Sequence, residues 1–193
     1  MLKYNACMSD ELSKILIKVL TIPLAIVIAL VVLTIKKLPI KEYFGLKIPS
    51  RKESIFWLLL FLPIFAIGEI YYFGTGLNEG RIWEYSLDVM IVRIIGIVIL
   101  APVCEELIYR GVLFQAISKS KMGYIGAVIL TTVLFTASHF QYGIADLATI
   151  FVDALYWGWV RYKTGSTILP IVMHIFNNSI SVVEFIWLNK MIG

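Results

Sequence analysis

Charged side chains are scarce in this sequence. Only 16% of its 193 residues are Asp, Glu, Lys or Arg, and 60% are hydrophobic, whereas soluble domains carry about 25% charged and about 45–50% apolar residues. The composition excludes an ordinary soluble domain and indicates a chain whose solvent is the lipid bilayer, where helices satisfy the backbone. The net charge of +4 has no basic stripe, which argues against nucleic acid as a partner and suits loops that face anionic membrane lipids.

Cysteine is rare too, and familiar hydrolase patterns are missing. Cys7 and Cys104 are too few and too far apart for a disulfide framework, and we expect Cys104 to be a small buried residue. The helix-borne His-Glu-x-x-His pattern and the Gly-x-Ser-x-Gly elbow are absent. A serine mechanism from Ser138 beside His139 is not expected, because adjacent helix residues do not face each other. The lack of an internal repeat argues against transporters built from two related halves.

Long apolar runs fill most of the chain and predict an all-α fold. We expect a polytopic transmembrane helix bundle of about six to eight helices, multi-pass in the cell membrane, with an intramembrane polar cavity. One integral membrane domain would cover residues 1–193. The segment 36–53 is rich in Lys and Arg, so the positive-inside rule places it in the cytoplasm. The expected spans cover residues 15–35, 54–74, 87–102, 103–118, 122–140, 144–162 and 167–188.

The number of spans depends on Pro102. If residues 87–118 form one kinked span, the total is about six and the basic residues that follow fall on the cytoplasmic side. If Pro102 separates two helices, the total is about seven, and Glu105 and His139 lie near the same end. We favour the second arrangement, because the groups of a reacting site must meet in space.

An acidic doublet follows the apolar run 90–103. Glu105 and Glu106 are adjacent, and Arg110 comes one turn later. Each charge near the centre of a bilayer costs about 2.5–3.5 kcal/mol on insertion scales, so such a group predicts a function. On a helix, Glu106 and Arg110 form an i,i+4 pair, while Glu105 points about 100° away from Glu106. We predict that Glu106 and Arg110 hold each other and that Glu105 is free for chemistry; a buried ion network that only joins helices is the alternative.

The chain has only two histidines, His139 and His174, and both come late in apolar segments. Phe135 shares a helix face with the first, and Asn178 shares one with the second. Glu105 as a general base could take a proton from water, and the two imidazoles could orient that water or bind a metal. Asn178 could hydrogen-bond the oxyanion that develops on a carbonyl. Together these residues would support amide hydrolysis.

Other polar residues within the apolar runs need partners. Arg93 and Glu69 are expected to pair across helices, and Asp146 is expected to cap a helix start. Asp153 is a candidate for the wall of the cavity. Packing or the interfacial belt is the simplest role for the aromatic residues Tyr156, Trp157 and Trp159.

Three motifs occur in order along the chain: Glu105-Glu106-x-x-x-Arg110, Phe135-x-x-x-His139 and His174-x-x-x-Asn178. They resemble the signature motifs of the CPBP (Abi) intramembrane proteases, a family that includes type II CAAX prenyl endopeptidases and bacteriocin-immunity proteins. The resemblance covers residues 100–180 and implies a membrane helix bundle with a water-accessible cavity. It places at the active-site positions Glu105, Glu106, His139, His174 and Asn178, with Arg110 and Phe135 in support.

The resemblance implies an intramembrane endopeptidase of the metalloprotease class. Glu105, His139 and His174 could complete three ligands of a catalytic zinc, or could activate water without a metal. The chain is compact like the bacterial members, so the expected substrate is a hydrophobic or membrane-associated peptide or protein, with a role in bacteriocin or peptide maturation or in self-immunity. A non-catalytic bacteriocin-immunity or scaffold protein and a proton-coupled carrier are the alternatives from other classes.

Overall fold

The computed structural model describes residues 23–74 and 87–192. These residues are almost entirely helical, which confirms the all-α prediction for this part of the chain. The expectations for residues 1–22, including Cys7, and for residues 75–86 lie outside the described residues.

The helices follow one another through short turns. Pro23–Ile35 is the first described helix. The later helices are α2 (Ile40–Tyr43), α3 (Arg51–Gly74), α4 (Leu87–Ile95), α5 (Ala101–Glu106), α6 (Phe114–Ser118), α7 (Gly123–Ala137), α8 (Ile144–Thr164) and α9 (Ile168–Ile192). Two π-helical segments, η1 (Gly96–Leu100) and η2 (Leu107–Leu113), join α4 to α5 and α5 to α6.

Residues 87–118 form one continuous helical path. The junction residues Leu100, Glu106 and Leu113 all have right-handed helical backbone angles. The prediction that Pro102 separates two helices is therefore wrong. Pro102 is the second residue of α5 and directly follows the wide turn of η1, so its missing N–H falls inside the continuous helix. At 1.5 Å per residue the path is roughly 48 Å long.

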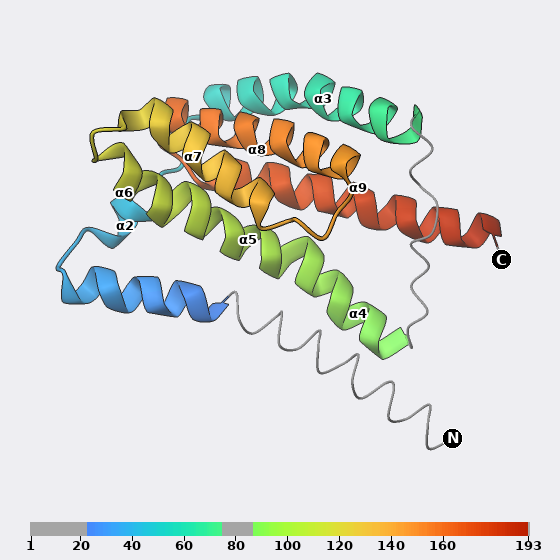
Figure 1. Cartoon of the computed structure of the whole chain (residues 1–193), viewed down its shortest axis with the longest axis horizontal. Coiled ribbons are helices and arrows are strands. Elements are labelled where there is room, and N and C mark those ends of the chain that lie inside the picture. The colour runs from blue at the N-terminus through green and yellow to red at the C-terminus, as the bar shows by residue number, and fades with distance from the viewer. Residues whose placement is uncertain (1–22, 75–86, 193) are drawn as a thin grey trace, which may run out of the picture.

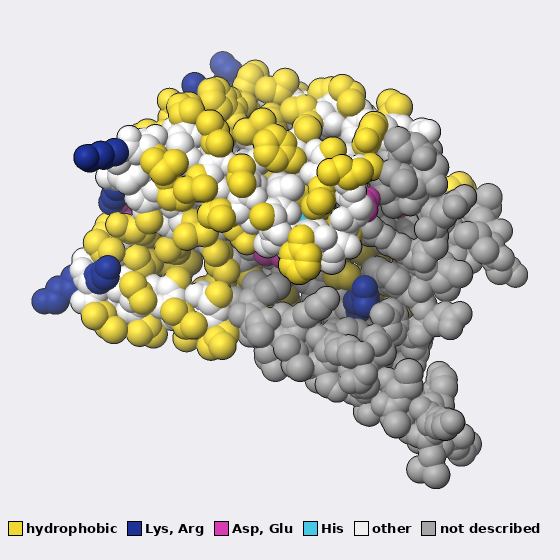
Figure 2. Space-filling model, in the orientation of Figure 1, with side chains coloured by type: hydrophobic (Ala, Val, Ile, Leu, Met, Phe, Trp, Pro, Cys, Tyr) yellow, Lys and Arg dark blue, Asp and Glu magenta, His cyan; other side chains and the backbone are white. Residues whose placement is uncertain are grey.

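Successive passages run alternately between two ends of the molecule (Figure 1). Pro23–Ile35 reaches the left end, α3 leaves it, the path 87–118 returns to it, and α7, α8 and α9 alternate after that. Lys and Arg side chains gather at the same left end, as the dark blue atoms in Figure 2 show. In the described part of the chain, this alternation brings the basic turns together at one end. The basic residues of these turns are Lys36, Lys37, Lys41, Lys47, Arg51, Lys52, Lys119, Lys121, Arg161 and Lys163.

Large hydrophobic side chains cover much of the visible outer surface (Figure 2). On α3, the exposed fractions of Leu59, Ile67 and Ile70 are 60%, 68% and 72%. By length and composition, Arg51–Tyr71 is the one helical segment among the described residues that could cross a membrane. Shorter apolar helices occupy Pro23–Ile35, Gly123–Ala137 and Ile168–Glu184.

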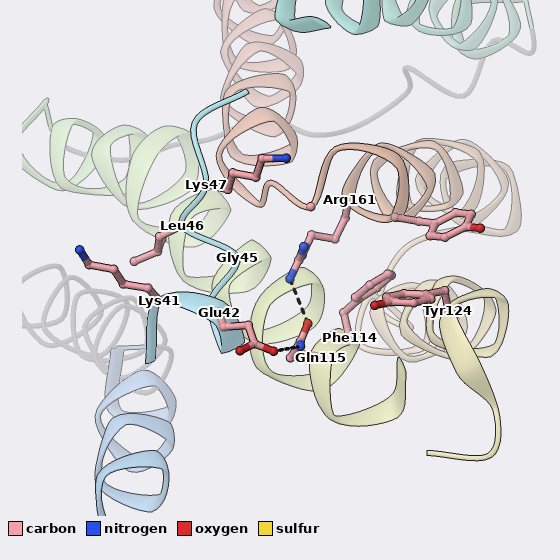
Figure 3. Close-up of a pocket in the computed structure, with 11 residues that line it drawn as sticks. Lys41, Glu42, Gly45, Leu46, Lys47, Phe114, Gln115, Tyr124 and Arg161 are labelled. Atoms are coloured by element: carbon pink, nitrogen blue, oxygen red, sulfur yellow. Dashed lines mark hydrogen bonds between the residues drawn. The ribbon is translucent and has the colours of Figure 1, made fainter. Parts of the chain in front are cut away.

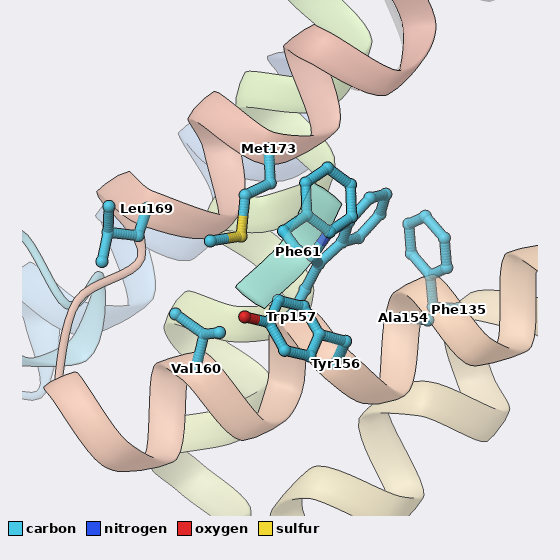
Figure 4. Close-up of a cluster of buried hydrophobic side chains, with 8 residues drawn as sticks. All are labelled: Phe61, Phe135, Ala154, Tyr156, Trp157, Val160, Leu169 and Met173. Carbon is cyan, nitrogen blue, oxygen red and sulfur yellow. The ribbon is translucent and has the colours of Figure 1, made fainter. Parts of the chain in front are cut away.

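The hydrophobic core lies where α3, α7, α8 and α9 meet (Figure 4). The ring of Phe61 on α3 stacks on that of Tyr156 on α8 with centroids 5.8 Å apart, and the Tyr156 hydroxyl donates to the Trp57 carbonyl at 2.7 Å. Gly158 lets α8 approach α7 closely, since a Cβ there would meet Val128 at 3.4 Å. The core cluster consists of Phe61, Phe135, Ala154, Tyr156, Trp157, Val160, Leu169 and Met173.

Candidate active site

Glu106 and Arg110 form the buried ion pair that their spacing predicts. Both side chains are 0% exposed, and Arg110 Nη1 donates to Glu106 Oε1 at 3.0 Å. Arg110 Nη2 donates to the Ala154 carbonyl on α8 at 2.9 Å, and its guanidinium lies 4.5 Å from the centroid of the Phe135 ring. The pair therefore joins the long helical path to α7 and α8, so it also has the helix-joining role that the alternative interpretation gave it.

Glu106 also orients His174. His174 Nδ1 lies 3.1 Å from Glu106 Oε1, which already accepts a hydrogen bond from Arg110. An ionised carboxylate can only accept, so Nδ1 carries the proton and Nε2 keeps its lone pair. The imidazole is further held by Trp157, whose ring stacks on it at 4.4 Å with an angle of 24°. The sequence interpretation missed Trp157, because nothing distinguishes it from the other aromatic residues before α8 and α9 are docked.

The free Nε2 of His174 faces Glu105. Glu105 Oε2 lies 3.9 Å from this nitrogen, too far for a direct hydrogen bond but close enough for both groups to contact one water. The Glu105 side chain is 19% exposed, whereas that of Glu106 is fully buried. Of the two adjacent acids, Glu105 is therefore the one that a substrate or a water molecule can reach.

His139 lies in the turn after α7, in contact with Phe135. Its Nδ1 lies 2.8 Å from the Phe135 carbonyl, which again leaves the lone pair on Nε2. The Phe135 ring contacts both imidazoles, with centroids 4.6 Å from His139 and 5.7 Å from His174. Phe135 thus has the packing role expected of it, and it packs against both histidines.

Ser138 does approach His139, contrary to the expectation from helix geometry. α7 ends at Ala137, so the two residues lie in a turn, and Ser138 Oγ is 3.3 Å from His139 Nδ1. The hydroxyl donates to the Phe135 carbonyl at 2.7 Å, and Nδ1 is directed to the same carbonyl. Neither group is arranged to take a proton from the other, so the contact does not form a nucleophile–base pair.

Asn178 fills a gap that a proline leaves in the long helical path. The Ala101 N–H bonds the Gly96 carbonyl in the wide π register, so the next donor in that register would belong to Pro102, which has no N–H. Asn178 Nδ2 donates to the Ile97 carbonyl at 2.9 Å and takes the place of that donor. The Asn178 side chain therefore docks α9 onto η1, a role that the sequence interpretation did not foresee.

The lengths of the helices place the site residues at one depth. Glu105 lies near the middle of the path 87–118, and α7 has only 15 residues, so it is roughly 22 Å long and ends well short of the opposite end. The turn with His139 consequently lies partway between the two ends of the bundle (Figure 1). One continuous helical path thus keeps the basic turns at one end while Glu105 lies near its middle, so the two requirements that the sequence interpretation set against each other need not conflict.

A metal site is not assembled in the described residues. No group of three or more His, Cys, Asp and Glu side chains there lies close enough to hold one ion. Glu105 Oε2 lies 3.9 Å from His174 Nε2, and the Phe135 ring contacts both histidines. The zinc prediction for these three residues stays a prediction.

The structure also bears on the roles predicted for the other polar residues, Asp146, Glu69 and Asp153. The N-cap of α8 is Gly143 without a side-chain cap, so the prediction that Asp146 caps this helix is wrong; Asp146 lies in the first turn, where a negative charge suits the helix dipole. Glu69 on α3 is hydrogen-bonded to Glu184 on α9, and Asp153 lies near Glu69. The pairing of Glu69 with Arg93 stays a prediction.

Comparison with known proteins agrees with the motifs. Residues 87–180 match the family model described as type II CAAX prenyl endopeptidase Rce1-like. An uncharacterized 24.3 kDa protein of Escherichia coli is 32% identical over 94 residues, which cover 47% of this chain and 43% of that protein. The matched region thus spans less than half the length of this relative. No solved structure matches the chain.

The three motifs all lie inside the matched region. The family match thus covers the region that carries the motifs, and the resemblance inferred from them is confirmed.

Proposed function

We propose that this chain is an intramembrane endopeptidase in which Glu105 activates water to hydrolyse a peptide bond. The observation that carries the proposal is the Glu105–His174 pair. A partly accessible carboxylate lies 3.9 Å from an imidazole Nε2, and the tautomer of that imidazole is fixed by a second, fully buried glutamate. The match to a CAAX protease family model supports proteolysis as the reaction.

The proton movements follow from the hydrogen bonds. Water would transfer one proton to Glu105 while its other O–H donates a hydrogen bond to Nε2 of His174. The water oxygen would attack the scissile carbonyl carbon. The carbonyl π electrons move to oxygen and then return as the C–N bond breaks. The proton held by Glu105 is transferred to the departing amine. The reaction consumes one water and leaves one carboxyl and one amino terminus.

His139 and Asn178 have supporting roles in this proposal. Because its Nδ1 is directed to the Phe135 carbonyl, His139 can offer only the Nε2 lone pair, so it would accept a hydrogen bond from water or from a peptide N–H. Asn178 uses one amide hydrogen on the Ile97 carbonyl, and the second would be the one available to the oxyanion. A zinc ion held by Glu105, His139 and His174 would supply Lewis-acid activation, and metal analysis of the purified protein tests that prediction.

The membrane setting is part of the proposal. The apolar exterior, the alternating passages and the basic turns at one end support a multi-pass bundle with that end in the cytoplasm. The site then lies at mid-depth, where a hydrophobic peptide or a membrane-protein segment would enter from the bilayer. Peptide maturation and bacteriocin self-immunity are the roles that fit such a substrate.

Glu105→Gln in the full-length protein tests the reaction. In nanodiscs with a panel of fluorogenic hydrophobic peptides, the substitution should lower turnover by about 10²–10⁴-fold, the usual value of a general base. Glu53→Gln, an exposed glutamate at the start of α3, is the matched control and should retain turnover. Full turnover by a folded Glu105→Gln variant would remove the proposal. A non-catalytic immunity protein would instead protect cells equally well with either residue at 105.

A further inference from the structure

A cavity of about 680 Å³ opens at the basic end of the bundle, away from the candidate active site (Figure 3). Its volume lies in the range of small-molecule sites. The segment after α2, the end of α8 and the start of α6 form its walls, and the cations Lys41, Lys47 and Arg161 line it together with Glu42 and Gln115.

Arg161 is the unusual member of this lining. Its side chain is 5% exposed, and its hydrogen bonds go only to uncharged acceptors: Nε donates to the Arg110 carbonyl at 2.7 Å, and Nη2 lies 3.4 Å from Gln115 Oε1. No carboxylate among the described residues forms an ion pair with this guanidinium. A buried charge without a counter-ion is costly, which makes it a candidate for binding an anion.

The acidic residue of the cavity is already neutralised. Glu42 Oε1 accepts from Lys119 Nζ at 2.9 Å and from Gln115 Nε2 at 2.9 Å. The hydrogen bond to Glu42 raises the pKa of Lys119, so this pair stays ionised. Lys47 Nζ donates to the Thr164 carbonyl at the end of α8. The cavity therefore presents an excess of positive charge.

A glycine holds the wall of the cavity against Arg161. Gly45 has φ +63°, and a Cβ there would lie 2.7 Å from Arg161 Cζ and 2.5 Å from Thr167 Oγ1. The backbone of this turn therefore lies directly on the guanidinium, and the Gly45 carbonyl accepts from the Thr167 N–H at 2.9 Å. The turn fixes the position of the guanidinium at the floor of the cavity.

We propose that this cavity binds the phosphate of an anionic membrane phospholipid, with Arg161 at its floor and Lys41 and Lys47 at its rim. The location of the cavity favours a lipid: it opens among the basic turns, at the end that the positive-inside rule places against the anionic cytoplasmic leaflet. This binding is separate from the proposed proteolysis, and its readout does not depend on any substrate.

Lipid binding is measured on the full-length protein in a non-ionic detergent. Short-chain phosphatidylglycerol, phosphatidylcholine with the same acyl chains, and inorganic phosphate are each titrated while the thermal unfolding midpoint is recorded. Phosphatidylglycerol should raise the midpoint saturably, and phosphatidylcholine should not. Saturation by inorganic phosphate at similar concentrations would keep the anion site and identify free phosphate as the ligand, whereas equal effects of the two lipids would overturn the proposal.

Substitutions at two lysines at the same end of the bundle distinguish binding in the cavity from attraction to general surface charge. Lys41→Glu should weaken phosphatidylglycerol binding by about tenfold or more, since it reverses a charge on the rim. Lys121→Glu reverses an exposed charge outside the cavity and should leave the affinity within about twofold. Arg161→Gln, where it folds, should abolish saturable binding. Equal losses in the two lysine variants, or unchanged binding by folded Arg161→Gln protein, would refute the site.

Discussion

Replacing either of the two adjacent glutamates with glutamine should have different effects on the stability of the fold. In Glu106→Gln, the guanidinium of Arg110 loses its carboxylate partner while both side chains remain fully buried. Breaking a buried pair by removing one charge costs about 3–5 kcal/mol. The glutamine oxygen can still accept one hydrogen bond, so we expect the lower part of this range. A loss of about 3 kcal/mol in a chain of this length lowers the unfolding midpoint by about 6–12 °C.

Glu105→Gln should be nearly neutral for stability. The distance between Glu105 Oε2 and His174 Nε2 is 3.9 Å, so the amide loses no direct hydrogen bond. Its side chain is partly exposed, so no fully buried charge is left behind. We expect the unfolding free energy to stay within about 1 kcal/mol of the wild type while turnover falls. The substitution at position 106 is thus expected to lower stability, whereas the substitution at position 105 is expected to lower turnover.

The tautomer of His174 provides a readout that a purely structural role of Glu106 would not move. The chain has only two histidines, so ¹⁵N-histidine NMR spectra can be assigned by comparison with a His139→Gln variant. The wild type should show protonated Nδ1 on both rings, and Glu106→Gln should shift His174 toward a mixture. If Glu106→Gln unfolds at the same temperature as Glu105→Gln and leaves the His174 signals unchanged, the assigned division of roles is wrong.

Three further predictions test how the site is supported. Phe135→Ala removes a ring that is 2% exposed and contacts both imidazoles, so it should cost about 3–5 kcal/mol in denaturant unfolding and lower turnover, with Phe135→Leu as the milder control. Asn178→Ala should cost about 1–3 kcal/mol by leaving the Ile97 carbonyl unpaired, and a second change, Pro102→Ala, should recover much of that loss by restoring an N–H; additive losses in the double variant would disprove this pairing. Gly45→Ala should lower the unfolding midpoint, because the new Cβ overlaps a buried guanidinium at a positive φ, whereas Gly68→Ala meets no atom within 4 Å and should be tolerated.

Local spacing predicted those contacts that depend on one helix. The Glu106–Arg110 pair is four residues apart, so helix geometry alone places the groups together, and the structure contains this pair. The contacts of His174 with Glu106 and Trp157 join segments that are distant in the chain. No periodicity reports which faces of two helices meet, so the second role of Glu106 could not be inferred from spacing.

The errors at Pro102 and Asp146 have a common origin. Both predictions started from the usual local preference of a residue type, a break for proline and a cap for aspartate. At Pro102 the requirement that the site residues meet then decided for a break over a kink. At Pro102 the preceding wide turn and the amide of Asn178 satisfy the backbone, so the helix continues. At the start of α8 the chain turns at Gly143, three residues before Asp146. In both places neighbouring backbone geometry decided the outcome.

The two π-helical segments make the spacing around the acidic doublet unusually sensitive to chain length. A π turn accommodates one residue more than an α turn, so deleting a single residue between Gly96 and Leu100 would let the helix close into ordinary register. The side chains before the deletion would then rotate by about 100° relative to Glu105 and its neighbours. One missing residue, with every motif intact, would thus separate the α9 docking face of this helix from its reactive face.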